Sequence, residues 1–144
     1  MIAYLDSSVI LRRLLNQANA LPQWGEWDHA CTSELTRVEA FRKVDHLRIQ
    51  GGFTEEEVAV FVEELEEVLG HFSIIPLQKM ILDRASLPLP SVVGTLDAIH
   101  IASALVWRER RPEEIVFFTH DAQQGTAAKA LALKTGGFTK PLPS

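Results

Sequence analysis

Short apolar runs alternate along this chain with longer segments of helical periodicity, and this alternation constrains the fold more than any other feature. A short apolar run is typical of a buried strand, whereas apolar residues three and four positions apart are typical of a helix. Strands that alternate with helices through short loops predict an α/β domain with a mainly parallel sheet. The strand-like runs are 2–5, 29–32, 72–77 and 115–119.

Hydroxyl side chains at the starts of the helical patterns predict where the helices begin, because they can accept hydrogen bonds from free backbone N–H groups. Thr54, followed by Glu57 three positions later, has the pattern of a capping box. Residues 87–94 contain two prolines and are expected to lack regular structure. The predicted caps are Ser7 or Ser8, Ser33, Thr54 and Thr95, and the last helix is predicted from Asp121 to about Lys134.

The length and composition of the chain predict a single domain over residues 1–144. Its hydrophobic content is 47% and its charged content is 23%, which is ordinary for a soluble globular protein. No apolar run approaches the ~20 residues of a membrane span, and the N-terminus lacks the pattern of a secretory signal. The single cysteine, Cys31, excludes an internal disulfide. We therefore expect a cytoplasmic protein that does not associate with membranes.

The acidic excess of the chain is concentrated in one predicted helix. The net charge is −5, from 19 carboxylates against 14 lysines and arginines, and this balance argues against non-specific binding to a nucleic-acid duplex. Runs of like charge usually form a solvated surface, which is the interpretation we adopt for this segment. Its glutamates are Glu55, Glu56, Glu57, Glu63, Glu64, Glu66 and Glu67.

Four other carboxylates stand apart because their sequence neighbours are apolar. Asp6 ends the first strand-like run, and Asp121 follows the last one. Glu39 lies beside the apolar stripe of a predicted helix, and Asp97 lies in the first turn of another. A carboxylate in apolar surroundings is energetically costly unless it is paired or binds a metal ion.

Each of these four acids also has a purely structural interpretation. The three aspartates are predicted at helix N-termini, where free N–H groups and the helix dipole favour a carboxylate. Glu39 has no such role, because it lies in the middle of its helix. Its structural alternative is a salt bridge with Arg42 or Lys43, which follow at about one turn's spacing.

The joint placement of the acids predicts a metal site. In a parallel sheet the strand ends and the following helix N-termini share one edge, so Asp6, Asp97 and Asp121 are expected to converge there. Two carboxylates about 4 Å apart repel by about 4 kcal/mol at an effective dielectric constant of about 20. An all-oxygen cluster is therefore expected to hold a hard cation, Mg²⁺ or Mn²⁺. Such ions support the hydrolysis of phosphodiester bonds.

Two histidines are expected near the same edge. His100 lies three residues after Asp97 on the same helix face, and we expect a structural hydrogen bond there, with substrate contact or metal ligation as alternatives. His120 is expected to be exposed. Neither belongs to a zinc-binding spacing, and the sequence has no glycine-rich phosphate loop. Trp24 and Trp27 are expected to pack against other side chains rather than stack on bases.

Four segments in this order resemble the PIN-domain ribonucleases, and specifically the VapC toxins of type II toxin–antitoxin systems. They are YLDSSVILRRLL, TSELTRVEAFRKV, LDAIHIASAL and FFTHDAQ, and the resemblance that rests on them extends over nearly the whole chain. The resemblance implies a three-layer α/β/α PIN fold and endonucleolytic cleavage of RNA by a water that the metal activates. It implies that Mg²⁺ or Mn²⁺ is held by Asp6, Glu39, Asp97 and Asp121.

The resemblance also implies supporting residues and partners. Ser8 and Thr119 would orient a carboxylate or hold a water beside the first and last acids. A small cognate antitoxin would block the site, often by supplying an arginine or lysine, and the protein would form a homodimer. Relatives often carry a basic residue just before the LDA segment, which this chain lacks. Arg12, Arg13 or Arg37 would then contact the RNA phosphates, unless they are ordinary surface charges.

Other functions are compatible with the same residues. A metal-dependent DNA nuclease of related fold would use the same carboxylates, because an activated water does not itself select RNA. A phosphoacceptor signalling domain also gathers carboxylates at a sheet edge, but it requires an acid after a middle strand, and run 72–77 ends without one. A catalytically idle interaction domain is disfavoured by the intact set of four acids. A metal-dependent endoribonuclease toxin is the leading hypothesis.

Overall fold

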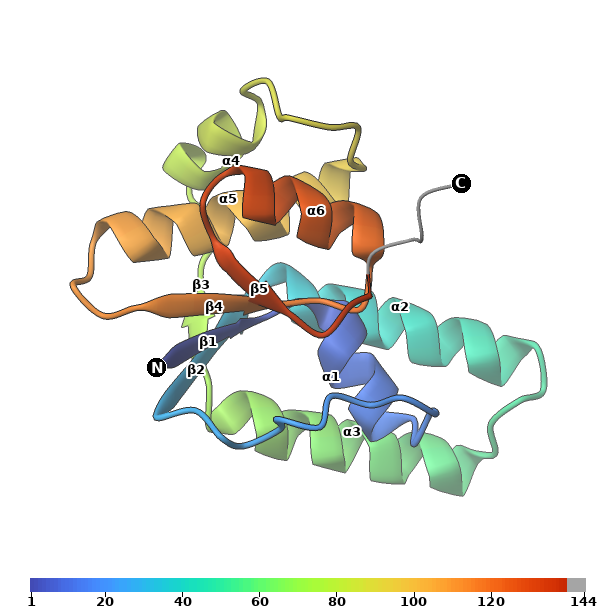
Figure 1. Ribbon diagram of the computed structural model, residues 1–144. Helices are drawn as coiled ribbons and strands as arrows, with labels where there is room; N and C mark the ends of the chain where they lie inside the picture. Colours follow the sequence, from blue (N-terminus) through green and yellow to red (C-terminus); the bar gives the residue numbers. More distant parts are fainter. Residues whose placement is uncertain (140–144) are drawn as a thin grey trace.

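A sheet of five parallel strands forms the centre of the computed structural model, which describes residues 1–139 (Figure 1). The strand order is β3-β2-β1-β4-β5, and each neighbouring pair is parallel. This confirms the predicted α/β class and the parallel sheet. The strands are β1 (Ile2–Leu5), β2 (His29–Ser33), β3 (Ser73–Ile75), β4 (Ile115–Phe118) and β5 (Lys134–Gly136).

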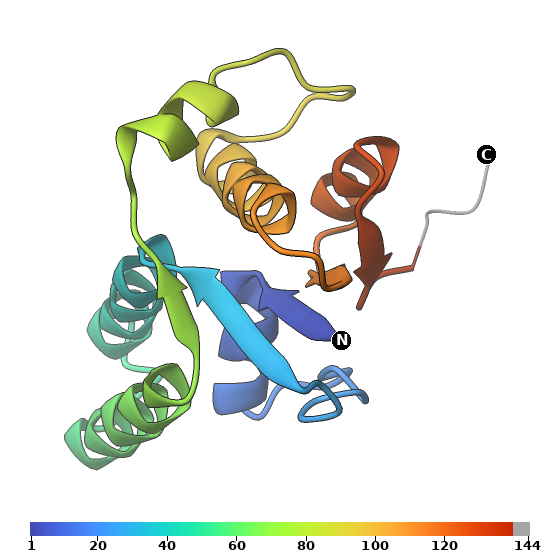
Figure 2. The ribbon, with the colours of Figure 1, turned by 90° about the vertical axis from the view of Figure 1, so that its left-hand side faces the viewer.

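Helices cover both faces of the sheet, which gives the predicted three layers. Figures 1 and 2 show α1, α2 and α3 on one face and α4, α5 and α6 on the other. Both faces of the sheet are therefore shielded from water, as all-parallel sheets require. The helices are α1 (Ser7–Leu14), α2 (Leu35–Ile49), α3 (Glu55–Gly70), α4 (Lys79–Ala85), α5 (Thr95–Glu109) and α6 (Ala122–Ala130).

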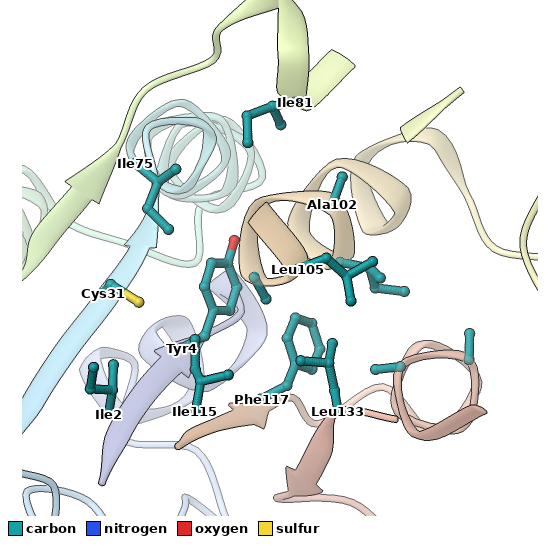
Figure 3. Close-up of a cluster of buried hydrophobic side chains, with 14 residues drawn as sticks. Ile2, Tyr4, Cys31, Ile75, Ile81, Ala102, Leu105, Ile115, Phe117 and Leu133 are labelled. Atoms are coloured by element: carbon teal, nitrogen blue, oxygen red, sulfur yellow. The ribbon is translucent and has the colours of Figure 1, made fainter. Parts of the chain in front are cut away.

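Successive residues of β1 pack into two different hydrophobic cores. Ile2 and Tyr4 lie in the core under α4, α5 and α6, whereas Ala3 and Leu5 lie in the core under α1, α2 and α3. In the first core, shown in Figure 3, the ring of Tyr4 stacks on Phe117 with the centroids 5.2 Å apart. The strand is buried along its whole length. This two-sided burial explains why it is apolar at every position until it leaves the sheet.

The end of β1 lies where the strand order changes direction. From β1 the chain adds β2 and β3 on one side and then β4 and β5 on the other. The Asp6 N–H donates to the Phe118 carbonyl at 2.9 Å, which holds the ends of β1 and β4 side by side. Open parallel sheets bind ligands outside the carboxyl ends of the strands at such a point. The acids that follow these strands therefore share the expected place for a site.

The C-terminal part of the chain differs from the prediction. α6 ends at Ala130 rather than near Lys134, and Ala132 then adopts a φ of 63°, which turns the chain. Leu133 is buried, and residues 134–136 pair with β4 as an edge strand. Three residues are too few to show a strand pattern, so the sequence suggests a longer helix. The proline-containing end, residues 140–144, lies outside the described residues.

The predicted caps of α2 and α5 are wrong, and that of α3 is confirmed. Ser33 is the last residue of β2, and α2 begins at Leu35, although the Ser33 hydroxyl still accepts a hydrogen bond from the Leu35 N–H at 3.1 Å. Thr95 is the first residue of α5 rather than its cap, and Gly94 in the cap position has no side chain to offer. The capping box that begins with Thr54 forms at the start of α3 as predicted.

α3 has the two faces that its sequence predicts. Its seven glutamates are exposed, whereas Phe61, Leu65 and Leu69 are buried against the sheet side of the molecule. The acidic surface of α3 is thus solvated. Within residues 1–139, no helix combines the length and the apolar character that crossing a membrane requires.

Candidate active site

Asp6 is the most buried of the four candidate acids, with only 3% of its surface exposed. It follows β1 directly, and its Oδ2 accepts a hydrogen bond from the Ser8 N–H at 3.0 Å. Asp6 is therefore the N-cap of α1. The prediction that Ser7 or Ser8 caps this helix is wrong, because the chain turns from strand to helix at Asp6 itself.

Gln124, on α6, connects Asp6 to the other strand end, and the sequence analysis missed it. Its Nε2 donates to Asp6 Oδ1 at 3.2 Å and to the backbone carbonyl of Asp97 at 3.3 Å. Its Oε1 accepts a hydrogen bond from the Thr119 hydroxyl at 2.6 Å. The side chain is fully buried. One amide thus fixes the positions of β1, α5 and the residue after β4 relative to each other.

Ser8 and Thr119, the two predicted supporting hydroxyls, lie together between α1 and the end of β4. Their oxygens are 3.4 Å apart. Because the Thr119 hydroxyl already donates to Gln124, the proton between them comes from Ser8. Ser8 Oγ in turn accepts from the His120 N–H at 3.1 Å. These hydroxyls therefore hold the loop after β4 against the start of α1.

Asp121 caps α6 and is exposed. Its Oδ1 accepts a hydrogen bond from the Gln124 N–H at 2.9 Å, and its own N–H donates to Thr119 Oγ1 at 3.0 Å. The structural interpretation of Asp121 as a helix cap is therefore confirmed. In these contacts, capping uses only Oδ1 of the Asp121 carboxylate. Asp121 directly follows His120 at the edge of the sheet.

Glu39 is linked to β1 through His100 and Tyr4. His100 Nε2 lies 2.6 Å from Glu39 Oε1, and its Nδ1 lies 2.6 Å from the Tyr4 hydroxyl. Since a carboxylate accepts, Nε2 carries a proton and donates to Glu39, and when the ring is neutral the Tyr4 O–H donates to Nδ1. The predicted structural hydrogen bond of His100 is confirmed. The structural alternative for Glu39, a salt bridge with Arg42 or Lys43, is not formed within residues 1–139, where Arg42 pairs with Asp45 instead.

Burial and nearby carboxylates shift the pKa values of His100 and Tyr4 in this chain of hydrogen bonds. Burial alone would lower the pKa of His100, but the hydrogen bond with Glu39 and the nearby Asp6 carboxylate raise it, and the net shift is upward. His100 Nε2 is 3.6 Å from Asp6 Oδ1. Burial, with Asp6 next in importance, raises the pKa of Tyr4 well above its usual value. His100 therefore lies between two carboxylates that stabilise its protonated form, in which Nδ1 would donate to the Tyr4 hydroxyl.

Asp97 carries the clearest electrostatic signature of the site. Its pKa is raised to about 6, chiefly by burial and then by the carboxylates of Asp6 and Asp121, with a smaller effect from Glu39. The structure therefore brings Asp6, Glu39 and Asp121 within electrostatic reach of Asp97. The four acids come from four separate parts of the chain, at the end of β1, in α2, in α5 and before α6.

The chemistry of this donor set suits a hard divalent cation, although its side chains are not already arranged as ligands. Within residues 1–139, no three His, Cys, Asp or Glu side chains form a group that could hold a metal ion. In that part of the chain, His100 is the one cationic partner of the four acids, through Asp6 and Glu39. Carboxylate oxygens with uncompensated charge are what Mg²⁺ and Mn²⁺ prefer.

The three arginines proposed to contact RNA lie in different surroundings. Arg37 forms an ion pair with Glu66 of α3, away from the acids, and its guanidinium lies over the Phe41 ring. Arg13 is exposed, and its guanidinium lies 5.2 Å from the ring centroid of Trp24. Trp24 packs edge-to-face on Trp27, as predicted. Arg12 lines a polar cleft, and its Nη1 donates to the Asn19 carbonyl at 3.3 Å.

His120 is half-buried, and the prediction that it is exposed is wrong. Its Nδ1 donates to the Gly137 carbonyl at 2.7 Å, and its Nε2 is buried without a partner among residues 1–139. Burial lowers the pKa of His120, and the positive charge of Arg12 adds to this effect. Gly137 has a φ of 90°, and a Cβ there would lie 2.7 Å from the Thr119 carbonyl oxygen, so this position needs glycine.

These features define a three-layer α/β/α domain with acids gathered beyond β1 and β4, and a family model for the PIN domain matches residues 3–132. The chain belongs to the PIN domain family. It is similar to ribonuclease VapC47 of Mycobacterium tuberculosis (strain CDC 1551 / Oshkosh), with 30% identity over 125 residues. The alignment covers 82% of this chain and 83% of that protein. The resemblance stated from the sequence is confirmed.

Two solved structures share the fold. A toxin–antitoxin complex from Klebsiella pneumoniae contains a chain with a TM-score of 0.62 and 17% identity, and the match covers 99% of both chains. A domain of a functionally unknown protein from Methanocaldococcus jannaschii DSM 2661 has a TM-score of 0.53 and 17% identity, covering 99% of this chain and 94% of that one. At these identities the likeness shows the fold alone.

Proposed function

We propose that this protein is a metal-dependent endoribonuclease that hydrolyses phosphodiester bonds in RNA and acts as the toxin of a toxin–antitoxin pair. The proposal treats residues 1–144 as one PIN domain. One observation carries it: the fold gathers carboxylates from separate elements, with Glu39 and Asp6 lying 2.6 and 3.6 Å from His100 Nε2, and burial followed by the carboxylates of Asp6 and Asp121 raises the pKa of Asp97 to about 6. Such mutual repulsion is costly and makes sense where a cation neutralises it. Membership of the PIN family and the similarity to a VapC ribonuclease support this function.

The residues that would hold Mg²⁺ or Mn²⁺ are Asp6, Glu39, Asp97 and Asp121. When bound, such a cation supplies charge neutralisation at the phosphate and makes a water more acidic. The neighbouring side chains and backbone of the protein orient the carboxylates that would hold the cation. Gln124 and the Ser8 N–H hold the two oxygens of Asp6, while His100, itself held by Tyr4, holds Glu39. Residues that orient carboxylates in this way raise the precision of a site without touching substrate.

The partners follow from the same proposal. We infer that single-stranded RNA is the substrate, that a small antitoxin protein covers the acids with a basic side chain, and that the toxin forms a homodimer in the cytoplasm. A solved toxin–antitoxin complex that shares the fold is consistent with the antitoxin. A phosphoacceptor role is less well supported, because β3 ends at Ile75 and Pro76 follows it rather than an acid.

The experiment that tests the function is cleavage of RNA by the purified protein. We expect cleavage of a single-stranded RNA with Mn²⁺ or Mg²⁺, none with EDTA, and a loss of at least about 10²-fold in Asp6→Asn and Asp97→Asn. Glu64→Gln is the matched control, because it removes an exposed carboxylate of α3 and leaves the site intact.

Two outcomes would contradict the proposal. Cleavage that survives EDTA together with both aspartate substitutions would show that the acids and a metal are not required. Cleavage of a flapped DNA in preference to single-stranded RNA, with the same dependence on Asp6 and Asp97, would instead make the protein a DNA nuclease of the same fold.

A further inference from the structure

Gly125 lies inside α6, although glycine is among the poorest helix formers. The structure supplies a reason for it. A Cβ at this position would lie 2.2 Å from Cε1 of the Phe138 ring, so the ring packs where a side chain would otherwise stand. Gly125 is buried, and Phe138 is half-buried. The missing side chain of Gly125 therefore makes room for an aromatic ring from the segment that follows β5.

The helical turn beneath this ring is the turn that Asp121 caps. The Gly125 N–H donates to the Asp121 backbone carbonyl at 2.9 Å, and the Asp121 carboxylate accepts from the Gln124 N–H at 2.9 Å. Phe138 thus packs on the residue that closes the first turn of α6. A single backbone hydrogen bond connects that residue to Asp121.

The two glycines before this ring contact the loop after β4. The Gly136 carbonyl accepts from the Thr119 N–H at 3.1 Å, and the Gly137 carbonyl accepts from His120 Nδ1 at 2.7 Å. A Cβ on Gly137 would lie 2.7 Å from the Thr119 carbonyl oxygen, so the two backbones approach closely here. Thr119 and His120 directly precede Asp121. Residues 136–138 therefore hold Asp121 from both sides, through its loop and through its helix.

We propose that residues 136–138 form a C-terminal clasp that positions Asp121 for the divalent cation. The inference rests on the proposed function, because it takes Asp121 as a ligand of that cation. Within residues 1–139 the Asp121 carboxylate accepts one hydrogen bond, from a backbone N–H of its own helix. Its position is thus set by the backbone that the clasp holds. The clasp residues are positioning residues, because they orient a ligand without contacting the cation.

Binding of Mn²⁺ alone, followed by isothermal titration calorimetry, tests this role without relying on RNA cleavage. We expect Phe138→Ala to weaken Mn²⁺ binding about tenfold, as for other residues that orient metal ligands. Phe138→Leu keeps an apolar side chain over Gly125 and should retain most of the wild-type affinity. In an Asp121→Asn background, Phe138→Ala should weaken binding by less than about twofold further, because both changes act through the same ligand.

Gly125→Ala tests the contact from the side of the helix. The added methyl group would displace the ring, so this variant should also weaken Mn²⁺ binding about tenfold, although alanine is the better helix former. In the double variant with Phe138→Ala there is no ring to displace. The double variant should therefore bind Mn²⁺ as Phe138→Ala does. Effects that multiply in the double variant would overturn the contact as their common cause.

Phe53→Ala is the matched control, because it removes another half-buried phenylalanine, from the core under α1, α2 and α3. We expect a lower melting temperature and a Mn²⁺ affinity within about twofold of the wild-type value. Equal losses of affinity in Phe53→Ala and Phe138→Ala, or an unchanged affinity in Phe138→Ala, would overturn the positioning role.

Amide hydrogen exchange in EDTA separates the clasp from the metal-dependent function. Phe138→Ala should speed the exchange of the Thr119 and Gly125 N–H groups at least about tenfold and leave that of Val58, in α3, unchanged. Mn²⁺ binding that is lost in Asp121→Asn but unchanged in Phe138→Ala would refute the clasp alone. An absence of Mn²⁺ binding by the wild-type protein would refute the proposed function, and faster exchange in Phe138→Ala would still support the hold of the clasp on the loop.

Discussion

Two regions of this protein are rich in carboxylates, and the carboxylates are exposed in one region and partly buried in the other. On α3 the glutamates are exposed; Glu57 closes a capping box, and Glu66 pairs with Arg37. Beyond β1 and β4 the acids are fewer, but Asp6 is buried and Asp97 is partly buried among other carboxylates. The first region has water and surface cations to screen it. The second has His100 as its one cationic partner among residues 1–139.

The difference shows that the number of charges does not locate a site. Seven glutamates on α3 cost little, because each of them keeps its hydration. At the sheet edge, burial and then the neighbouring carboxylates of Asp6 and Asp121 raise the pKa of Asp97 to about 6. If this comparison is correct, variants at the sheet edge should strongly change stability and RNA cleavage, whereas variants on α3 should change them little.

The largest effect on stability is expected from Gln124→Ala. The substitution leaves Asp6 Oδ1, the Asp97 carbonyl and the Thr119 hydroxyl without a partner in the interior. We expect a loss of about 2–3 kcal/mol in the free energy of unfolding. RNA cleavage should fall by about 10- to 100-fold, as for other residues that orient metal ligands. Urea unfolding and initial cleavage rates provide the two measurements.

Gln123→Ala is the control for this prediction, since it removes an exposed glutamine side chain from the preceding position of α6. Its effect on stability should stay within about 0.5 kcal/mol. If Gln124→Ala unfolds and cleaves like the wild-type protein, the hydrogen bonds of Gln124 do not support the site, and the distinction between the two acidic regions loses its main structural basis.

Divalent cations should distinguish the two regions directly. We expect saturating Mg²⁺ to raise the melting temperature, because a ligand present at about 100 times its Kd stabilises the folded state by about 2.7 kcal/mol. The shift should be lost in Asp97→Asn and kept in Glu64→Gln. Differential scanning fluorimetry measures both. A shift that disappears in Glu64→Gln instead would show that the cation binds to α3.

The pH dependence of the metal-free protein should report the repulsion at Asp97. Its folded pKa of about 6 lies above the ordinary aspartate value of 3.8, so the proton binds more tightly to the folded state. The stability that this group contributes is therefore present below about pH 4 and lost as the pH rises through about 6. With solvent screening taken into account, we expect a loss on the order of 1 kcal/mol.

Asp97→Asn should remove this part of the pH dependence and unfold at higher urea than the wild-type protein at about pH 7.5 in EDTA. The difference between the two proteins isolates Asp97 from the other titrating groups. If the variant is less stable than the wild-type protein both at about pH 4 and at about pH 7.5, capping of α5 rather than repulsion dominates at this position.

Some of this arrangement is predictable from the sequence because its cause is local. The apolar runs of β1 and β4 end at polar residues, and parallel strands place those ends at one edge, so the convergence of Asp6 and Asp121 follows. The capping box of α3 depends on two residues three positions apart. The cap of α1 is not predicted, because the choice between Asp6 and the serines depends on where the backbone turns.

Other parts depend on contacts between distant segments and have no local pattern. Gln124 meets Asp6 across 118 positions of sequence, and Tyr4 meets His100 across 96. A lone tyrosine in a buried strand does signal that its hydroxyl needs a partner, but not which one. The glutamine has no such signal, since the alanine-rich helix around it shows only a weak apolar face. β5 is missed because three residues at a sheet edge lack periodicity.

The smallest effect is expected on α3, where Glu66→Gln removes the ion pair with Arg37. Both side chains are about half exposed, and exposed pairs contribute about 0.2–1 kcal/mol. We expect a loss near the lower end of this range, abolished by high salt, and RNA cleavage equal to that of the wild-type protein. The reason is that Arg37 is held toward α3 and away from the acids. Cleavage that drops in Glu66→Gln and in Arg37→Ala alike would place Arg37 among the RNA contacts and would extend the functional surface across α3.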